Sequence, residues 1–312
     1  MANHNLTDNF LYFFQRLNPG QTFINQAASH HQSITSLIEN PHGPARELSP
    51  KCFLQGSYKQ HTAIYTINDI DIVVLCNLWQ PGSAGSVSRS WGRDDIFDTI
   101  AAPLLNDGRY RDKVRYHNGS MCIKVDFGIK IEIFPVVYRA GNYNPLDEPF
   151  RLYRVENGRW EDGYARYHQG WLSNKNRYEI TNGNFIPAIK VFKHLRSIFG
   201  LDMVSFHIEC LLFSLPNWLF TGLAADYIPN ILSYIASTSA TDWYKKVVPT
   251  PCGERDIFTQ SEWTVESWVK FHEFIVLWAY IANLANQASS RDEAIKYWKI
   301  LLGDNFFPRQ VS

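Results

Sequence analysis

The segment 68–75, NDIDIVVL, constrains the fold more than any other part of the chain. Its β-branched residues over 70–75 predict a buried strand. Asp69 and Asp71 lie two positions apart at the start of this run, and side chains at positions i and i+2 share one face of a strand. The sequence therefore predicts two carboxylates side by side at the exposed end of the strand.

Two carboxylates this close together favour a bound cation. Like charges raise each other's pKa unless a cation lies between them. Hard divalent cations such as Mg²⁺ prefer oxygen ligands, and a pair of such ions stabilises both the attacking and the leaving oxygen in phosphoryl transfer. Asp-x-Asp pairs are also common in loops. The surrounding sequence is therefore needed to distinguish a metal site from an ordinary turn.

Gly56 and Ser57 lie shortly upstream, between a short predicted strand at 52–55 and an expected helix. Glycine lets the backbone approach a phosphate closely, Ser57 adds a hydroxyl donor, and a helix N-terminus offers free N–H groups to an anion. A Gly-Ser pair alone is uninformative. Followed by Thr62 and the aspartate pair, it predicts a binding loop for a triphosphate.

A two-metal site needs a third carboxylate, and a predicted hairpin offers two. Strands are expected over 121–127 and 129–138, joined by a tight turn around Gly128. Glu132 is flanked by apolar residues, where a charged side chain usually has a partner or a metal. Asp126 is expected to be a solvated residue at a strand end, and it remains the alternative third ligand.

The character of the chain changes near residue 165. The part before it is mixed α/β: two helices separated at Pro19-Gly20, a mobile Gly/Ser-rich loop at 81–90, a helix over 94–105 and an irregular crossing over 141–162. The part after it is mainly helical. The predicted helices there are 164–172, 185–199, 205–215, 224–237, 263–287 and 291–302.

The composition excludes several classes of protein. Thirty Lys and Arg balance thirty Asp and Glu, which argues against a protein coated in nucleic acid. Five scattered cysteines form no CxxC pair, so neither a zinc ribbon nor a disulfide framework is indicated. The first ten residues lack a signal pattern, and the apolar stretch 274–285 is shorter than the roughly 20 residues that span a bilayer. A soluble, cytoplasmic protein without a membrane partner is expected.

The pattern GSYKQHTAI, then NDIDIVVL, then IEIFPVV resembles the polymerase-β-like nucleotidyltransferases. Within them it is most similar to the cyclic GMP-AMP synthase and dinucleotide cyclase-like group, which includes oligoadenylate synthetases and bacterial enzymes of antiphage signalling. The resemblance covers most of the chain. It implies an α+β fold: a nucleotidyltransferase core with a mixed sheet and N-terminal helices in residues 1–165, and a helical C-terminal lobe in 166–312 that closes the nucleotide cleft.

Two further matches lie in the helical half. The stretch IKVFKHL resembles the family helix whose lysine reaches the triphosphate, which implies that role for Lys193, with Lys190 as the alternative. The stretch SFHIE resembles the family's Ser-aromatic-His segment. It implies Ser205 near the phosphates and Phe206 stacked on a base. A solvated helix face for Lys193 and plain core packing for Phe206 are the competing interpretations.

By this resemblance the enzyme joins nucleoside triphosphates (ATP, GTP or others) into a cyclic oligonucleotide and releases pyrophosphate. Asp69, Asp71 and Glu132 would hold two Mg²⁺ ions, with Mn²⁺ as the alternative metal. One ion would lower the pKa of a ribose hydroxyl and the other would neutralise charge on the leaving pyrophosphate. The product would be a second messenger for a separate effector protein, in bacterial antiphage defence.

The chain also departs from the family pattern. The third acid of the family is generally aspartate, whereas this chain has Glu132. Several bacterial relatives have glycine where His61 stands. The His/Cys zinc insertion of the animal DNA sensor is absent, so zinc-dependent DNA sensing is not expected.

Three other functions remain open, two enzymatic and one non-enzymatic. A linear oligoadenylate synthetase or RNA-tailing enzyme would need a basic RNA-binding face, which the neutral charge does not support. A protein-modifying nucleotidyltransferase is the second. The third is a degenerate binding module, which the intact Gly-Ser and Asp-x-Asp motifs disfavour.

Overall fold

The computed structural model of this chain describes residues 5–80, 91–117, 120–139, 149–154 and 158–308. The loop predicted at 81–90 lies outside these residues. The chain divides into two compact units that alternate along the sequence. We call them the helical unit (Met1–Pro19, Thr62–Tyr65 and Gly170–Ser312) and the sheet unit (Gly20–His61 and Thr66–Gln169).

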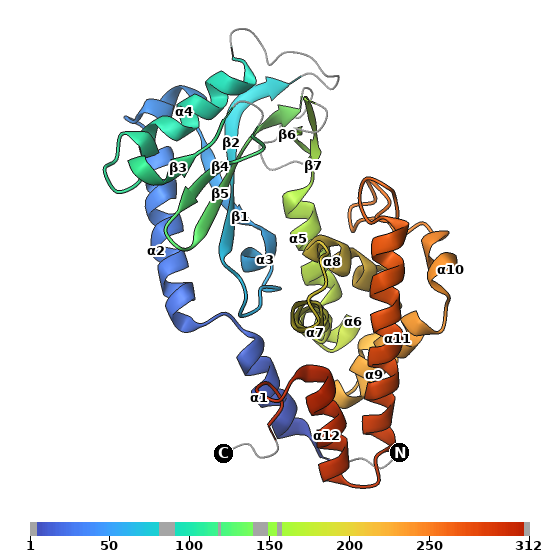
Figure 1. Cartoon of the computed structure of the whole chain (residues 1–312). Coiled ribbons are helices and arrows are strands. Elements are labelled where there is room, and N and C mark those ends of the chain that lie inside the picture. The colour runs from blue at the N-terminus through green and yellow to red at the C-terminus, as the bar shows by residue number, and fades with distance from the viewer. Residues whose placement is uncertain (1–4, 81–90, 118–119, 140–148, 155–157, 309–312) are drawn as a thin grey trace. The chain divides into compact units, whose positions relative to one another are not determined.

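The sheet unit is built on one mixed sheet, whose central strands β2 and β5 run parallel (Figure 1). The strand order is β1-β2-β5-β4-β3, with β6 pairing to β5 and β7 to β6. Within the described residues the strands are β1 (Lys51–Gln55), β2 (Asp69–Gln80), β3 (Val114–Arg115), β4 (Ile123–Asp126), β5 (Lys130–Arg139), β6 (Phe150–Arg154) and β7 (Arg159–Gly163). The predicted strands at 52–55 and 70–75 and the hairpin around Gly128 are confirmed.

The irregular crossing predicted over 141–162 is wrong for its described part, which contains β6 and most of β7. These strands continue the sheet beyond β5 as an antiparallel pair. Two arginines in β6 hide the alternation of apolar and polar residues that would have predicted a strand. In the fold Arg151 is buried because its guanidinium donates to Asp162 across the ladder, at 2.7 Å, and to the carbonyl of Trp160. A buried charge with these partners is compatible with a strand.

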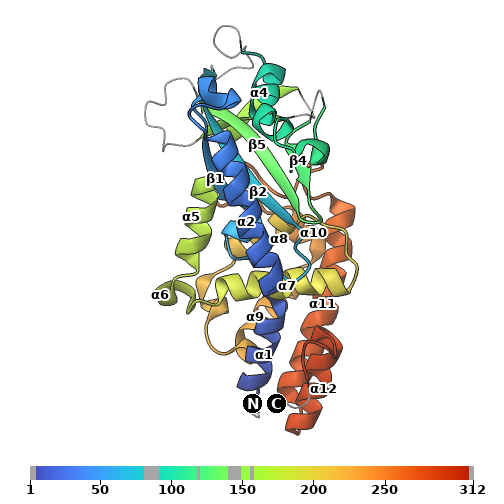
Figure 2. The same cartoon turned by 90° about the vertical axis from the view of Figure 1, so that its left-hand side faces the viewer.

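One face of the sheet is covered by helices, and Figure 2 shows α2 lying across it. Alternate residues of β2 point to this side, where Ile72, Val74 and Cys76 pack with apolar residues of α2 and α4 in one buried cluster. The helices of this unit are α2 (Gln21–Ile38), the short η1 (Pro44–Leu48), α3 (Gly56–Lys59), α4 (Arg93–Leu105) and η2 (Arg111–Lys113). The intervening residues of β2, including both aspartates, therefore face the other side.

The helical unit has a single large apolar core, to which α1 contributes together with the C-terminal helices. The helix α11 packs against α9 and α12. The helices are α1 (Thr7–Leu17), α6 (Tyr178–Thr181), α7 (Phe185–Ile198), α8 (Ser205–Ser214), η3 (Asn217–Phe220), α9 (Ala224–Ala236), α10 (Ala240–Tyr244), α11 (Val265–Gln287) and α12 (Arg291–Leu302). A further helix, α5 (Ala165–Lys175), begins in the sheet unit and ends in this one.

The α+β fold class is confirmed, and so are the predicted long helices, most within two residues at each end. The helices α6 and α10 were not predicted because four or five residues carry too little periodic signal. The division at residues 165 and 166 stays a prediction about functional lobes, while the contacts place α1 and residues 62–65 with the C-terminal helices. Among the described helices, none has both the length and the apolar character required to cross a bilayer.

Candidate functional site

The three predicted acids share one face of the sheet. Asp71 lies directly opposite Glu132 in the parallel β2–β5 ladder, and Asp69 lies opposite Lys130. Opposed residues in a ladder project to the same side. The strand pairing therefore brings Asp69, Asp71 and Glu132 together on the face that α2 and α4 leave uncovered.

The electrostatics of Asp71 show how close these acids are. Burial raises the pKa of Asp71 to about 7, and the negative charges of Asp69 and Glu132 contribute to this shift. The site therefore concentrates negative charge that the protein itself does not fully compensate.

Glu132 already has a cationic partner. Lys124 lies opposite it on β4, and the Lys124 Nζ atom is 3.0 Å from Oε1 of Glu132. The same contact raises the pKa of Lys124. Both side chains are partly solvent-exposed, so the pair contributes little to stability. Glu132 can therefore exchange this lysine for another cation at small cost.

No group of three His, Cys, Asp or Glu side chains in the described part of the chain is arranged so that it could hold a metal ion. The donor chemistry nevertheless fits a divalent cation. Asp69 and Asp71 offer oxygen ligands only, and a cation bound to them would offset both the burial and the neighbouring negative charges that raise the pKa of Asp71. For Glu132 to join them, its carboxylate has to share or exchange its contact with Lys124.

The carboxylate of Asp71 leaves room only for glycine at position 56. The φ of Gly56 is +70°, a region that side-chain-bearing residues rarely adopt, and a Cβ at this position would lie 1.8 Å from Oδ2 of Asp71. The residue before it, Gln55, pairs with Asp71 in the β1–β2 ladder. The Gly-Ser motif and the aspartate pair are thus neighbours in the fold. Ser57 follows in the short helix α3 and is half-buried.

Asp126, the alternative third acid, lies at the end of β4 and is exposed. Its Oδ1 accepts a hydrogen bond from the backbone N–H of Gly128, at 2.8 Å, so the carboxylate stabilises the hairpin turn. In the ladder it pairs with Lys130, which separates it from Asp69. Glu132, by contrast, directly adjoins Asp71.

In the helical unit, Lys193 is buried, with 2% of its surface exposed. Its Nζ donates to Oε1 of Glu209 at 2.7 Å and to Oγ1 of Thr62 at 2.9 Å, and the Thr62 hydroxyl donates to the same Glu209 oxygen at 2.8 Å. The interpretation of Lys193 as a residue on a solvated helix face is therefore wrong. Its predicted contact with a triphosphate stays a prediction.

Glu209 is the member of this network that the sequence analysis missed. It lies in the apolar run HIECLLF of α8, and a lone acid in such a run signals a buried partner. The partner could not be identified because Thr62 is 147 positions away in the sequence. The alternative lysine, Lys190, is half-buried and donates to Oδ1 of Asn18 at 2.7 Å.

The segment Thr62–Tyr65 belongs to the helical unit although it connects α3 with β2. Besides the Thr62 contacts, the backbone N–H of Tyr65 donates to the carbonyl of Leu17 at 2.9 Å, and the Tyr65 hydroxyl lies 3.3 Å from Nδ1 of His194. The segment that links the Gly-Ser motif to the aspartate pair is therefore held by side chains of the helical unit.

Ser205 and Phe206 begin α8. The hydroxyl of Ser205 accepts a hydrogen bond from Arg196 at 2.9 Å. Phe206 is half-buried, and the guanidinium carbon of Arg255 lies 5.5 Å from its ring centroid. The predicted contacts of Ser205 with phosphates and of Phe206 with a base stay predictions.

Comparison with known proteins assigns the family. The model of the Second Messenger Oligonucleotide or Dinucleotide Synthetase domain matches residues 5–176. The chain belongs to this family. The model of the C-terminal helical domain of cGAS/DncV-like nucleotidyltransferases matches residues 172–281. The resemblance to the cyclic GMP-AMP synthase and dinucleotide cyclase-like group is thereby confirmed, and the chain is a nucleotidyltransferase of a family that makes cyclic oligonucleotides.

Two curated relatives of this synthetase family are similar over most of the chain. The cyclic UMP-AMP synthase of Rhodothermus marinus is 23% identical over 270 residues, which cover 80% of this chain and 90% of the relative. The cyclic AMP-AMP-AMP synthase of an Acinetobacter species is 24% identical over 322 residues, which cover 97% of this chain and 85% of the relative.

The fold is also that of a solved synthetase. The structure of the Rhodothermus marinus CdnE c-UMP-AMP synthase with Apcpp and Upnpp superposes with a TM-score of 0.67 at 22% identity, over 88% of this chain and 96% of that one. At this level of identity the match supports the fold: a mixed-sheet core followed by a helical domain.

Proposed function

We propose that this synthetase joins nucleoside triphosphates into a cyclic oligonucleotide messenger and releases pyrophosphate, with Asp69, Asp71 and Glu132 as its catalytic, metal-binding acids. The observation that carries the proposal is the cluster of these three acids on one face of the β2–β5 ladder, where charge repulsion and burial act together on Asp71. In a nucleotidyltransferase such a cluster is suited to divalent cations.

Two Mg²⁺ ions, or Mn²⁺ in their place, are the proposed cofactor. When bound, they would lower the pKa of the attacking ribose hydroxyl and neutralise charge on the leaving pyrophosphate. Asp69 and Asp71 would hold them from β2. Glu132 would turn to them from Lys124, which is free to exchange partners because it is solvent-exposed.

The remaining predicted residues have positioning tasks. Gly56 leaves room for the Asp71 carboxylate, and the Ser57 hydroxyl would donate to a phosphate oxygen. Ser205 would contact the phosphates and Phe206 would stack on a base. For Lys193 we propose an indirect role: bound to Glu209 and Thr62, it holds the segment between the two motifs.

The relatives suggest part of the substrate. Both are named for a cyclic product that contains AMP, which supports ATP as one of the triphosphates. We further propose that the product is read by a separate effector protein in antiphage defence and that the enzyme acts in the cytoplasm. A linear oligoadenylate synthetase, an RNA-tailing enzyme or a protein-modifying nucleotidyltransferase would use the same acids.

Product analysis separates these functions. The purified chain is incubated with Mg²⁺ and the four labelled triphosphates, treated with phosphatase and examined by chromatography and mass spectrometry. The proposal predicts a small phosphatase-resistant product that disappears when EDTA is added in excess. A ladder of phosphatase-sensitive products would indicate linear synthesis, and label retained on protein would indicate protein modification. Product formed at full rate in EDTA would exclude the proposed metal site.

A further inference from the structure

Arg255 lies beside Phe206, the side chain proposed to stack on a base. Its guanidinium carbon is 5.5 Å from the Phe206 ring centroid, a distance at which a cation is attracted to an aromatic ring. The guanidinium of Arg93, by comparison, lies 3.7 Å from the centroid of Phe97. Arg255 is therefore close to the Phe206 ring without lying flat on it, and a base stacked on that ring would be within its reach.

An ion-pair network fixes the position of Arg255. Its Nε atom lies 3.0 Å from Oε1 of Glu262, and the other oxygen of that carboxylate lies 3.1 Å from Nε2 of His207. His207 is buried, and its ring stacks on Trp263. The backbone is held as well, because the carbonyl of Arg255 accepts a hydrogen bond from the N–H of Thr250 at 2.9 Å. The arginine is thus positioned before any ligand binds.

The outer end of the Arg255 side chain is available to a ligand. Its Nε atom is closed off from solvent against Glu262, whereas the two terminal nitrogens are not. Among the described residues, neither terminal nitrogen has a hydrogen-bond partner. A guanidinium carries donors and no acceptor. The side chain therefore presents oriented N–H groups that suit an oxygen acceptor.

The bases differ in a way that such a group can distinguish. Guanine and uracil carry an exocyclic oxygen that accepts hydrogen bonds, whereas adenine and cytosine carry an amino group that donates them at the corresponding position. Stacking on an aromatic ring is tolerant, because every base has a face to stack on. A guanidinium beside the stacked base would therefore favour the bases with a carbonyl.

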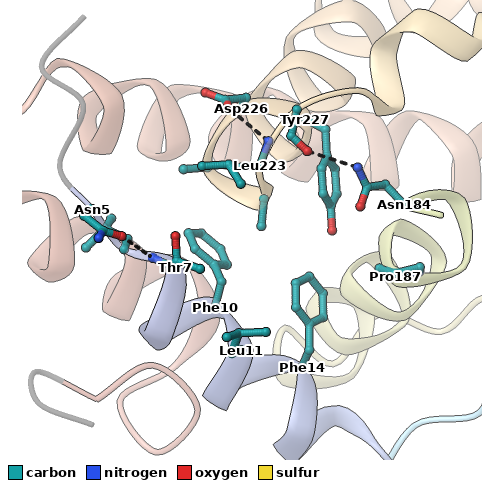
Figure 3. Close-up of a pocket in the computed structure, with 14 residues that line it drawn as sticks. Asn5, Thr7, Phe10, Leu11, Phe14, Asn184, Pro187, Leu223, Asp226 and Tyr227 are labelled. Atoms are coloured by element: carbon teal, nitrogen blue, oxygen red, sulfur yellow. Dashed lines mark hydrogen bonds between the residues drawn. The ribbon is translucent and has the colours of Figure 1, made fainter. Parts of the chain in front are cut away.

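Another cavity of the helical unit offers no such group. The pocket of about 540 Å³ between α1, the start of α7 and the residues that lead into α9 shares no residue with this network (Figure 3). Its described lining contains no lysine, arginine or histidine. That pocket therefore supplies no cationic donor to a nucleotide, whereas the surroundings of Phe206 do.

We propose that Arg255 is a specificity-determining residue of this synthetase. Its terminal N–H groups donate to the exocyclic carbonyl of a guanine or uracil stacked on Phe206, and Glu262 is the positioning residue that holds it there. The inference rests on the proposed function, in which Phe206 stacks on a base. It implies that at least one of the triphosphates that the enzyme joins carries guanine or uracil.

The test measures binding to the full chain by isothermal titration calorimetry with Mg²⁺. The ligands are four dideoxynucleoside triphosphates, which lack the attacking ribose hydroxyls and so bind without reacting. They form two pairs, adenine with hypoxanthine and cytosine with uracil, in which a carbonyl replaces an amino group. The parent should bind the carbonyl member of each pair more tightly. In Arg255→Met this preference, the ratio of the two dissociation constants, should fall by about five- to tenfold.

Three further variants separate this contact from its surroundings. Phe206→Leu should weaken the binding of all four ligands by a similar factor, since stacking does not distinguish the bases. Glu262→Gln should lower both ratios, but by less than Arg255→Met. Arg177→Met is the matched control, because Arg177 also pairs with a glutamate, Glu179, but lies before α6. It should leave both ratios unchanged.

Unchanged ratios in Arg255→Met overturn the inference. An equal loss of affinity for all four ligands also overturns it, because that result indicates a phosphate contact or a general loss of structure. If Phe206→Leu still weakens binding, either result leaves the proposed function intact. If Phe206→Leu binds all four ligands as tightly as the parent, the proposed stacking fails together with the inference. If the parent binds none of them, the proposed nucleotide site fails as well.

Discussion

A side-chain carbon on Gly56 would lie 1.8 Å from Oδ2 of Asp71 and 2.9 Å from its Cγ. Because both atoms belong to the carboxyl group of Asp71, Gly56→Ala has to displace the carboxylate. A displacement of about 1 Å in an active site can cost about 100-fold in rate. We expect Gly56→Ala to lose product formation by about that factor, measured as initial rate with labelled triphosphates.

Gly128→Ala is the control for backbone strain. Gly128 also has a positive φ, +85°, but a Cβ there would meet no atom within 4 Å. This variant should lose about 1–2 kcal/mol of stability from its backbone conformation and keep most of its activity. Equal losses of activity in the two variants would mean that strain, and not the Asp71 carboxylate, explains Gly56.

Lys193 and Glu209 should contribute to stability as a pair. Lys193→Met leaves the buried Glu209 carboxylate without its cation, and breaking a buried pair in this way costs about 3–5 kcal/mol. The double variant Lys193→Met/Glu209→Leu replaces both charges with apolar groups and should recover most of that loss. The measurement is urea unfolding of the parent, both single variants and the double variant.

The same variants address what Lys193 does. If Lys193→Met were as stable as the parent, the pair would not form in solution, and Lys193 would be available to bind the triphosphate directly. If the double variant folds and keeps its KM for triphosphate while kcat falls, Lys193 acts by positioning the Thr62–Tyr65 segment.

His194 should make stability depend on pH. Burial lowers its pKa to about 4 although its Nε2–H donates to the carbonyl of Leu302. Because the folded pKa is below the ordinary 6.5, the unfolded chain takes up the proton first as the pH falls. The contribution of His194 to the free energy of unfolding is therefore fully present above about pH 6.5. It decreases as the pH falls from about 6.5 to 4, and it changes no further below pH 4.

The size of this effect follows from the two pKa values. Between pH 7.5 and pH 5 the parent should lose about 2 kcal/mol more than His194→Gln, which does not titrate. Urea unfolding of both proteins at the two pH values measures the difference. Parallel losses in the parent and the variant would show that His194 is not held in its neutral form.

The sequence predicted the parts of the site that local pattern determines. Asp69, Asp71 and Glu132 could be proposed because strand alternation and apolar flanks are visible in short segments; the ladder places them on one face, and their catalytic role stays a prediction. The burial of Lys193 was not predictable, because it depends on Thr62 and Glu209, which only the tertiary fold brings to it.

A departure from the family pattern also has a structural explanation. His61, for which the resemblance implied a glycine in bacterial relatives, adopts a positive φ of 59°. Glycine enters this region without strain, whereas other residues do so at a cost of roughly 1–2 kcal/mol. The position therefore requires a left-handed backbone, which this chain achieves with an exposed histidine.

The most direct test of the account is the double variant Asp69→Asn/Asp71→Asn, assayed for product and for melting temperature side by side. Asparagine keeps the size of each side chain and removes the buried charge and the repulsion that together raise the pKa of Asp71. We expect no detectable product, a melting temperature no lower than that of the metal-free parent, and a much smaller rise on adding Mg²⁺ with triphosphate than the parent shows. A folded double variant that still makes product would contradict the assignment of the active site.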